Sequence, residues 1–266
     1  MEMIRYTLKR MLCPALVVLL FFSSCKKENL SATQEPVVEA YLMPGTALTV
    51  KLYAQKSLTD TAGYGPALTG LKLSVSNGGN TATLTETAAG VYTYADTSFL
   101  AAGKTYTLSF IYNAVTVSAR TTMPAKPQGF TTQHINVDYT PPTSPGILDT
   151  LNIFSWQNPD SLNHVLVFEG LDGKSFPLNT FGGGGSVNFE VNTNRKSVYY
   201  ALPQIFSYYS HYHVILLSVN QEYINLLQSN AESANSQSLL NIPTNVVNGL
   251  GIFTAMQADT LSFNLL

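Results

Sequence analysis

The chain contains 266 residues, of which 45% are hydrophobic, 11% aromatic and 11% charged. Its 14 Lys and Arg residues and 16 Asp and Glu residues leave a formal charge of −2, which excludes a nucleic-acid-binding protein that relies on clustered basic side chains. Low charge, together with 15 Tyr and 13 Phe residues, favours strands over helices. The length suits one large or two small domains.

The first 25 residues have the pattern of a secretory signal that ends at a cysteine. Three basic residues precede an apolar run over residues 12–22, and Ser23-Ser24 lead into Cys25. The run is about half of the roughly twenty residues that span a bilayer. We predict a bacterial lipoprotein signal over residues 1–24, after which Cys25 becomes an acylated, palmitate-bearing N-terminus. The alternatives are a secretory signal cut elsewhere and an uncleaved anchor.

Residues 25–35 are mostly polar and are predicted to form the lipidated tether. The chain has only two cysteines: Cys13 leaves with the signal and Cys25 carries the lipid. The mature chain would therefore contain neither a free thiol nor a disulfide, although secreted proteins often use disulfides. This prediction excludes cysteine catalysis and cysteine-based metal sites.

Residues 36–125 predict a first β-sandwich. Apolar and polar residues alternate with a period of two in several short stretches, and Asn77-Gly78-Gly79-Asn80 has the composition of a hairpin turn. A second turn is predicted at Asn113-Ala114. The spacing of about ten residues between strands, without a helical window, predicts an Ig-like or transthyretin-like sandwich. The predicted strands cover residues 37–42, 48–53, 71–75, 81–85, 91–94, 106–112 and 115–121.

Pro124 and Pro127 mark a predicted boundary near residue 125, followed by a second, fibronectin-like β-sandwich over residues 126–266. Trp156 is the only tryptophan, and we expect it in the core of this sandwich. Apolar residues from Tyr223 to Leu227 recur at helical spacing, so we predict a short helix over residues 221–228. The predicted strands of this block cover residues 133–137, 148–156, 163–169, 186–191, 212–219 and 260–265.

Several short motifs occur together in this chain. They are the signal ending at Cys25 with Lys26-Lys27 after it, the stretches 36–42 and 248–253, and Gly90-Val91-Tyr92 followed by residues 103–108. With the helix around Tyr223, they resemble the domain-of-unknown-function 4249 family of Bacteroidetes lipoproteins. The resemblance implies an outer-membrane lipoprotein of the cell envelope, facing the periplasm or the cell surface. It also implies an accessory role beside a TonB-dependent receptor, and it supplies no catalytic residues.

Candidate catalytic and metal-binding motifs are weak. His211 and His213 would share one face of a strand, but a third metal ligand, such as Glu190 or Glu222, would have to come from elsewhere. The glycines at 182–185 lack the Lys-Ser/Thr of a phosphate-binding loop, so they predict a hairpin tip. No Gly-x-Ser-x-Gly motif is present, and the acidic residues show no diagnostic spacing. We therefore expect no enzyme activity, metal or cofactor.

Aromatic residues provide the candidate ligand-binding site. Exposed tyrosines combine a large, rigid contact area with a polar tip, which suits a glycan or peptide ligand or a partner protein. The alternative is that these side chains are core residues, with Tyr212 bracing the sandwich as a tyrosine corner does. The candidate residues are Tyr199, Tyr200, Phe206, Tyr208 and Tyr209.

The sequence thus leads to a non-catalytic lipoprotein that acts as an accessory binding or assembly module. Two other functions remain open at this stage. One is an atypical secreted hydrolase or carbohydrate-active enzyme, which would need a deep cleft with converging His213 and acidic side chains. The other is a structural envelope spacer, which would leave the aromatic residues buried.

Overall fold

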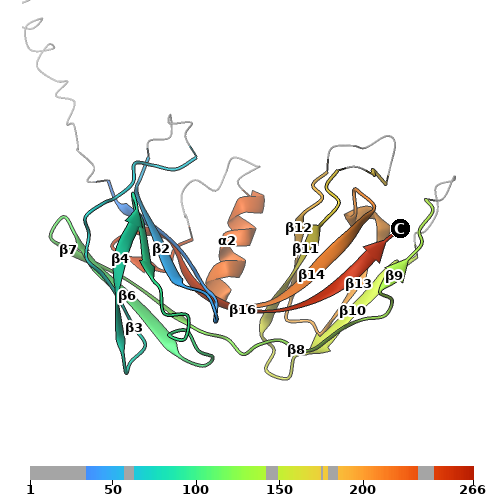
Figure 1. Ribbon diagram of the computed structural model, residues 1–266, viewed down its shortest axis with the longest axis horizontal. Helices are drawn as coiled ribbons and strands as arrows, with labels where there is room; N and C mark the ends of the chain where they lie inside the picture. Colours follow the sequence, from blue (N-terminus) through green and yellow to red (C-terminus); the bar gives the residue numbers. More distant parts are fainter. Residues whose placement is uncertain (1–33, 57–62, 142–148, 175, 179–184, 233–242) are drawn as a thin grey trace, which may run out of the picture. The chain divides into compact units, whose positions relative to one another are not determined.

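The computed structural model describes residues 34–56, 63–141, 149–174, 176–178, 185–232 and 243–266. All of them except residue 34 belong to one compact unit, residues 35–266. The described residues form strands, one α-helix and one short 3-10 helix, so the predicted mainly β class is confirmed (Figure 1). The unit consists of an N-terminal and a C-terminal lobe of β-sheet.

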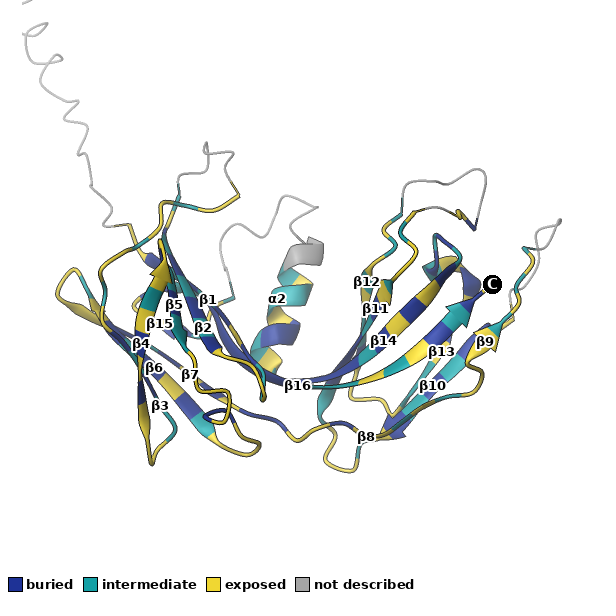
Figure 2. Ribbon diagram, viewed as in Figure 1, coloured by how far each residue is buried: buried dark blue, intermediate teal, exposed yellow. Residues whose placement is uncertain are grey.

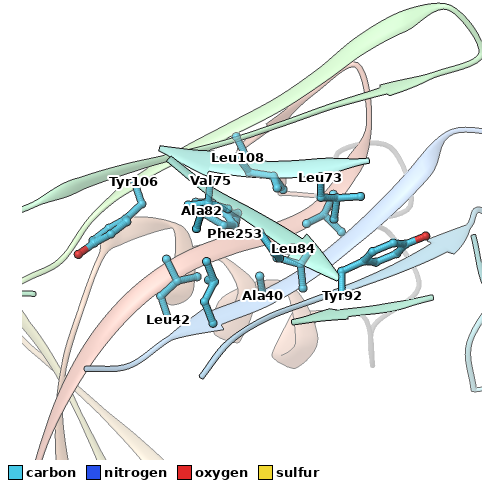
Figure 3. Packing of buried hydrophobic residues seen from close by; sticks show 14 of the residues in the cluster. Ala40, Leu42, Leu73, Val75, Ala82, Leu84, Tyr92, Tyr106, Leu108 and Phe253 are labelled. Carbon is cyan, nitrogen blue, oxygen red and sulfur yellow. The ribbon is translucent and has the colours of Figure 1, made fainter. Parts of the chain in front are cut away.

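The N-terminal lobe is a β-sandwich. Its two layers belong to one continuous sheet that folds over on itself, because β4 pairs with both β5 and β3. One layer contains β1 (Pro36–Leu42), β2 (Leu48–Ala54) and β5 (Val91–Tyr94), and the other contains β3 (Leu73–Ser76), β4 (Thr81–Ala88), β6 (Thr105–Tyr112) and β7 (Val115–Thr122). Buried and less buried residues alternate along β1, β2 and β3, as the period-two pattern predicts. Their inward side chains meet those of the facing sheet, including Leu73, Tyr92, Tyr106 and Phe253 (Figure 3).

Two predicted turns are confirmed. Asn113 and Ala114 join β6 to β7 with φ angles of +50° and +62°, the geometry of the two-residue turns that match strand twist. In the turn between β3 and β4, the Asn77 amide donates to the Asn80 carbonyl over 3.0 Å, and Gly78 has a φ of +85°. Both turns fix strand register, because each sits at the end of an antiparallel pair.

The C-terminal lobe packs a three-stranded sheet of β8 (Gln128–Thr132), β10 (Asn152–Gln157) and β13 (Val198–Ala201) against a second sheet. The second sheet contains β11 (Asn163–Gly170), β12 (Phe189–Asn194), β14 (Ser210–Val219) and the short β9 (Asn136–Val137). Trp156 is only 5% exposed and belongs to the core of this lobe, which confirms its predicted position.

The strand predicted over residues 133–137 is divided in the structure. β8 ends at Thr132 and β9 begins at Asn136. Between the two strands, the buried side-chain amide of Asn152 hydrogen-bonds both backbone groups of His134. Its Nδ2 donates to the His134 carbonyl over 2.7 Å, and its Oδ1 accepts from the His134 amide over 3.1 Å. These bonds replace ladder bonds to a neighbouring strand, so the strand is interrupted here.

The final strand, β16 (Leu250–Leu265), belongs to both lobes. Its first part runs parallel to β1, with Leu250 opposite Val37, and its second part runs antiparallel to β14, with Leu265 opposite Ser210 (Figure 1). The preceding β15 (Val246–Val247) pairs with β7. Residues 246–255 therefore complete the N-terminal lobe, although they follow the boundary expected near residue 125.

The predicted strand near residues 260–265 is thus only the end of a much longer one. Glycines at 249 and 251 are typical of a loop in sequence. In the structure, a Cβ on Gly251 would lie 2.0 Å from the Val38 carbonyl oxygen, and its φ is +98°. The glycine allows β16 to approach β1 closely, so here it continues the strand.

The predicted helix is confirmed and extends further, as α2 (Gln221–Glu232). Its apolar face packs against β11, β14 and β16, and Tyr223 and Ile224 are buried there. Just before the helix, Asn220 Nδ2 donates to Thr121 Oγ1 and to the Thr122 carbonyl, over 2.9 and 2.8 Å. Glu222 Oε1 accepts a 2.7 Å bond from Thr121 Oγ1. These bonds fasten the start of α2 to β7 of the N-terminal lobe.

Candidate functional site

The five aromatic residues predicted to bind a ligand do not form an exposed cluster. Phe206 and Tyr208 are buried at 2% and 4% exposure, and Tyr199 and Tyr209 are half-buried. Only Tyr200 is well exposed, at 56%. The expectation of an exposed aromatic cluster is therefore corrected, and the alternative of core residues holds for most of the set.

Ring packing explains this burial. Phe206 lies at the centre of the C-terminal core, with four aromatic ring centroids within 5.8 Å of its own. Such edge-to-face and tilted contacts stabilise a core beyond the area that they bury. A sequence rich in aromatic residues can therefore supply a core rather than a binding surface. The four rings belong to Phe168, Phe189, Tyr212 and Phe263.

Tyr212 has the role that the alternative interpretation assigned to it. Its buried hydroxyl donates a 2.7 Å hydrogen bond to the Tyr208 carbonyl, four residues earlier, as in a tyrosine corner. Burial, followed by the nearby Asp172 carboxylate, raises the pKa of Tyr212 to about 12. The hydroxyl is therefore a structural donor and not an acid–base group near neutral pH.

The structure instead gathers other apolar side chains at the far end of the C-terminal lobe. We call these residues the distal surface. They come from five separate places in the chain, at or next to the ends of β9, β11, β13 and β16 and in the connection after β11 (Figure 2). The distal surface consists of Ile135, Leu171, Phe176, Tyr200, Leu202 and Leu266, with exposures of 60%, 52%, 62%, 56%, 38% and 49%.

Backbone hydrogen bonds hold these segments together at the end of the lobe. The Leu171 amide donates to the His211 carbonyl over 2.8 Å, and the Phe176 carbonyl accepts from the Tyr209 amide over 2.8 Å. On the other side of β14, the Ile135 carbonyl accepts from the Asn264 amide over 2.7 Å. Four of the six exposed side chains are thus carried by backbone tied to β14 and β16 or to the residues next to them, whereas Tyr200 and Leu202 lie at the end of β13 in the three-stranded sheet.

A carboxylate–imidazole pair lies beside Leu171. Asp172 Oδ2 accepts from the His211 backbone amide and contacts His211 Nδ1, both over 2.8 Å. The hydrogen bond from the His211 amide, followed by that from its ring, holds the pKa of Asp172 below its ordinary value. Ser210 Oγ contacts this carboxylate and the His211 carbonyl, so these three residues do not form the relay of a serine hydrolase.

The ligands considered for a metal site are not brought together. Glu190 accepts a 3.2 Å bond from the Tyr223 hydroxyl, whose pKa is raised by burial and by that carboxylate. Glu222 is bound to Thr121 at the start of α2, and the His211 ring faces Asp172. In the described part of the chain, no three His, Cys, Asp or Glu side chains are arranged to hold a metal ion.

Among the described residues, two concave regions lie away from the distal surface. The larger, of about 220 Å³, is lined by polar residues of α2 and by residues 243–245, and the smaller, of about 90 Å³, lies around Pro127, Gln157 and His164. Both are smaller than usual small-molecule sites, which enclose about 300–1,000 Å³. Neither contains a residue that the sequence singled out for ligand binding.

Other sequence-predicted positions, Cys25 and the glycines at 182–184, lie outside the described residues. No helix in the described ranges has the length and apolar character to cross a membrane. The sequence reasoning missed five of the six residues of the distal surface, because each is an isolated apolar residue in a loop or at a strand end. No local pattern could have grouped them.

The fold and these surfaces define a mainly β protein with two sandwich lobes joined by a shared strand. A family model for a domain of unknown function, DUF4249, matches residues 28–262, and the chain belongs to this family. The resemblance found in the sequence motifs is thereby confirmed. No curated protein gives a significant match.

Three solved structures show limited similarity. They are the chicken CNTN1 FN1–FN3 domains (12% identity, TM-score 0.29), the Escherichia coli adhesin FdeC (16%, 0.20) and trypsin-activated alpha-2-macroglobulin from Escherichia coli (12%, 0.23). The matches cover 71%, 88% and 70% of this chain, and only 61%, 64% and 14% of those chains. The TM-scores are low, so the likeness does not extend to a shared overall fold and bears on no function.

Proposed function

We propose that this protein is a non-catalytic lipoprotein, anchored in the outer membrane through Cys25, that binds a partner membrane protein through its distal surface. The observation that carries the proposal is the gathering of six exposed apolar side chains at one end of the C-terminal lobe. Exposed apolar side chains that gather in one region of a protein are candidates for an interaction site. The signal pattern before Cys25 supports the anchor, and the resemblance of the sequence motifs implies a TonB-dependent receptor as the partner class.

The path of β16 separates the distal surface from the start of β1. Leu250 lies opposite Val37, one residue after the start of β1, whereas Leu265 precedes Leu266 of the distal surface. Sixteen residues of strand have a contour length of about 50 Å. A chain anchored through its N-terminal segment would therefore present the distal surface away from its attachment point, where a neighbouring membrane protein can reach it.

The chemistry of the surface favours a protein partner. Phe176, Leu171 and Tyr200 offer aromatic and aliphatic anchors of the kind that dominate protein interfaces. Complete burial of one such side chain contributes about 1.5–3 kcal/mol. Asp172 supplies a polar rim beside these anchors, since its carboxylate is fixed by His211. The two small concavities described above offer a drug-sized ligand less contact.

Co-purification from membranes dissolved in a mild detergent tests the proposal. The wild-type lipoprotein should carry a stoichiometric partner, and the double variant L171S/F176S should lose it. Tyr64→Ser is the matched control, because Tyr64 is similarly exposed at 57% but lies in the N-terminal lobe, stacked on Tyr53. Recovery of the wild-type lipoprotein alone would overturn the proposal and favour the envelope spacer. Equal loss of the partner in the control would exclude the distal surface as its site.

A further inference from the structure

A second group of exposed apolar residues lies at the opposite end of β16, on the N-terminal lobe. Ile111 and Val115 flank the turn between β6 and β7, and Val247 belongs to β15, with exposures of 65%, 48% and 59%. We call these three residues the apolar tip. Isolated exposed apolar residues are common, but three at one end of a sandwich need an explanation.

The three residues lie on neighbouring strands around the end of the hairpin, with Ile111 and Val247 on one face of the sheet and Val115 on the other. Ile111 lies opposite Thr116 across the hairpin, and Val247 lies opposite Ser118 on the next strand pair. The side chain of Asn248 joins the two strand pairs, because its Nδ2 donates to the Thr116 carbonyl over 2.9 Å. The apolar tip is therefore a fixed part of the sandwich, and the edge of the hairpin appears as an exposed projection in Figure 2.

The apolar tip lies next to the point where the chain enters the lobe. A Cβ on Gly249 would lie 2.8 Å from the Pro36 carbonyl oxygen, and Leu250 is paired with Val37. Pro36 is thus a close neighbour of residues 247–249, which are tied to the hairpin. The chain between Cys25 and Pro36 can extend to at most about 40 Å.

Charge at this end does not explain the exposed residues. Lys56 and Lys72 lie at the ends of β2 and β3 on this side, and Glu35 and Glu86 are nearby acidic residues. Glu86 accepts hydrogen bonds from the Gly70 and Gly90 amides, so its carboxylate is used within the lobe. These two cations and two anions cancel formally. Attraction to an oppositely charged partner is therefore weak here, and the apolar side chains are the distinguishing feature.

We propose that the apolar tip inserts into the interfacial region of the lipid bilayer and sets the orientation of the protein on the membrane. This inference rests on the lipid anchor of the proposed function. The anchor holds the tip within a short distance of the bilayer, which makes insertion an intramolecular step with a high effective concentration. Apolar side chains then gain from leaving water at the interface, as those of interfacial helices do. The distal surface, at the other end of β16, would point away from the bilayer.

Fluorescence quenching in vesicles tests this inference with the mature lipidated protein. The lipid occupies Cys25, so Ile111→Cys creates the single free thiol for an environment-sensitive fluorophore. Lys104→Cys is the matched control, because Lys104 is exposed just before the opposite end of β6, about 24 Å away along the strand. In phosphatidylcholine vesicles that contain brominated lipids, we expect several-fold stronger quenching at position 111 than at 104.

A second variant and a salt series separate the outcomes. With the label at 111, Val115→Ser combined with Val247→Ser should reduce the quenching towards the level at 104, and raised salt should leave the wild-type quenching unchanged, since screening affects charges only. Equal quenching at 111 and 104 in protein that floats with the vesicles would overturn the inference but not the anchor. Protein that does not float with the vesicles would overturn both the anchor and the inference. Circular dichroism verifies that the variants keep their strand content.

Discussion

The two lobes share β16 but are filled by different kinds of side chain. In the core of the N-terminal lobe, 5 of the 22 buried residues are aromatic, whereas in the core of the C-terminal lobe 6 of 13 are aromatic. Aliphatic residues on alternating strand positions can fill a sandwich with many small, independent contacts. The C-terminal core instead uses a few large rings that each contact several others, so a single residue there carries more of the packing.

The largest effect is expected from Phe206→Ala. Truncation of a fully buried Phe costs about 3–5 kcal/mol, because it removes the contacts of the ring and leaves a cavity. Urea unfolding, followed by circular dichroism, should show this loss. Phe176→Ala is the control: Phe176 is 62% exposed, and surface substitutions usually change stability by less than about 0.5 kcal/mol. Similar losses for both variants would contradict the aromatic core.

A substitution in the N-terminal lobe tests whether the shared strand couples the two cores. Leu108→Ala should cost about 2–5 kcal/mol, since Leu108 is fully buried among β-strand residues. Trp156 is the only tryptophan and reports on the C-terminal core. Because β16 pairs with both β1 and β14, the unfolding midpoint seen by Trp156 fluorescence should shift together with the midpoint seen by circular dichroism. An unchanged fluorescence midpoint would mean that the lobes unfold independently.

A smaller effect is expected where β16 meets β1. Gly251→Ala forces a Cβ towards the backbone oxygen of Val38 at a φ of +98°, and we expect a loss of about 1–3 kcal/mol from overpacking and backbone strain. Gly45→Ala is the matched control. Gly45 also has a positive φ of +81°, but a Cβ added there would meet no atom within 4 Å. Thermal unfolding of both variants separates the contact from the φ penalty. A loss at Gly251 no greater than at Gly45 would show that close approach is unimportant.

The smallest effect concerns the pH dependence of the distal end. Hydrogen bonds from His211 lower the pKa of Asp172 in the folded protein. The stabilisation is therefore present above the unfolded pKa of about 3.9 and is lost as the pH falls through the lower folded pKa. At neutral pH, Asp172→Asn should unfold at a slightly lower temperature than the wild type. This difference in unfolding temperature should disappear in strong acid. Thermal unfolding at a series of pH values measures it; a difference that grows in acid would contradict this assignment.

Much of the secondary structure could be predicted from local pattern. The strands of the N-terminal lobe, the turn at Asn113-Ala114 and the start of α2 at Gln221 follow from alternation, turn residues and helical spacing. The interruption at His134 could not be predicted, because it depends on the side chain of Asn152, 18 residues away in sequence. The length of β16 was missed for a similar reason, since the close approach to β1 is a tertiary contact.

At the candidate site, the contrast between what local sequence predicts and what tertiary contacts decide is larger. Aromatic content indicates only that large rings are present, and the fold decides that Phe206 is buried while Tyr200 is exposed. The distal surface combines residues separated by up to 131 positions, from Ile135 to Leu266, which no sequence window contains. Three-dimensional packing is the only source of that grouping.

The sequence by itself determined the mainly β class, the family and the prediction of a lipid anchor at Cys25, because these depend on local composition and short motifs. Only the tertiary structure decided which apolar residues fill the cores and which remain on the surface. Burial depends on the facing sheet and on the path of β16, and those contacts join residues that are distant along the chain. The same strand therefore fixes both the cores and the two exposed ends on which the proposed function depends.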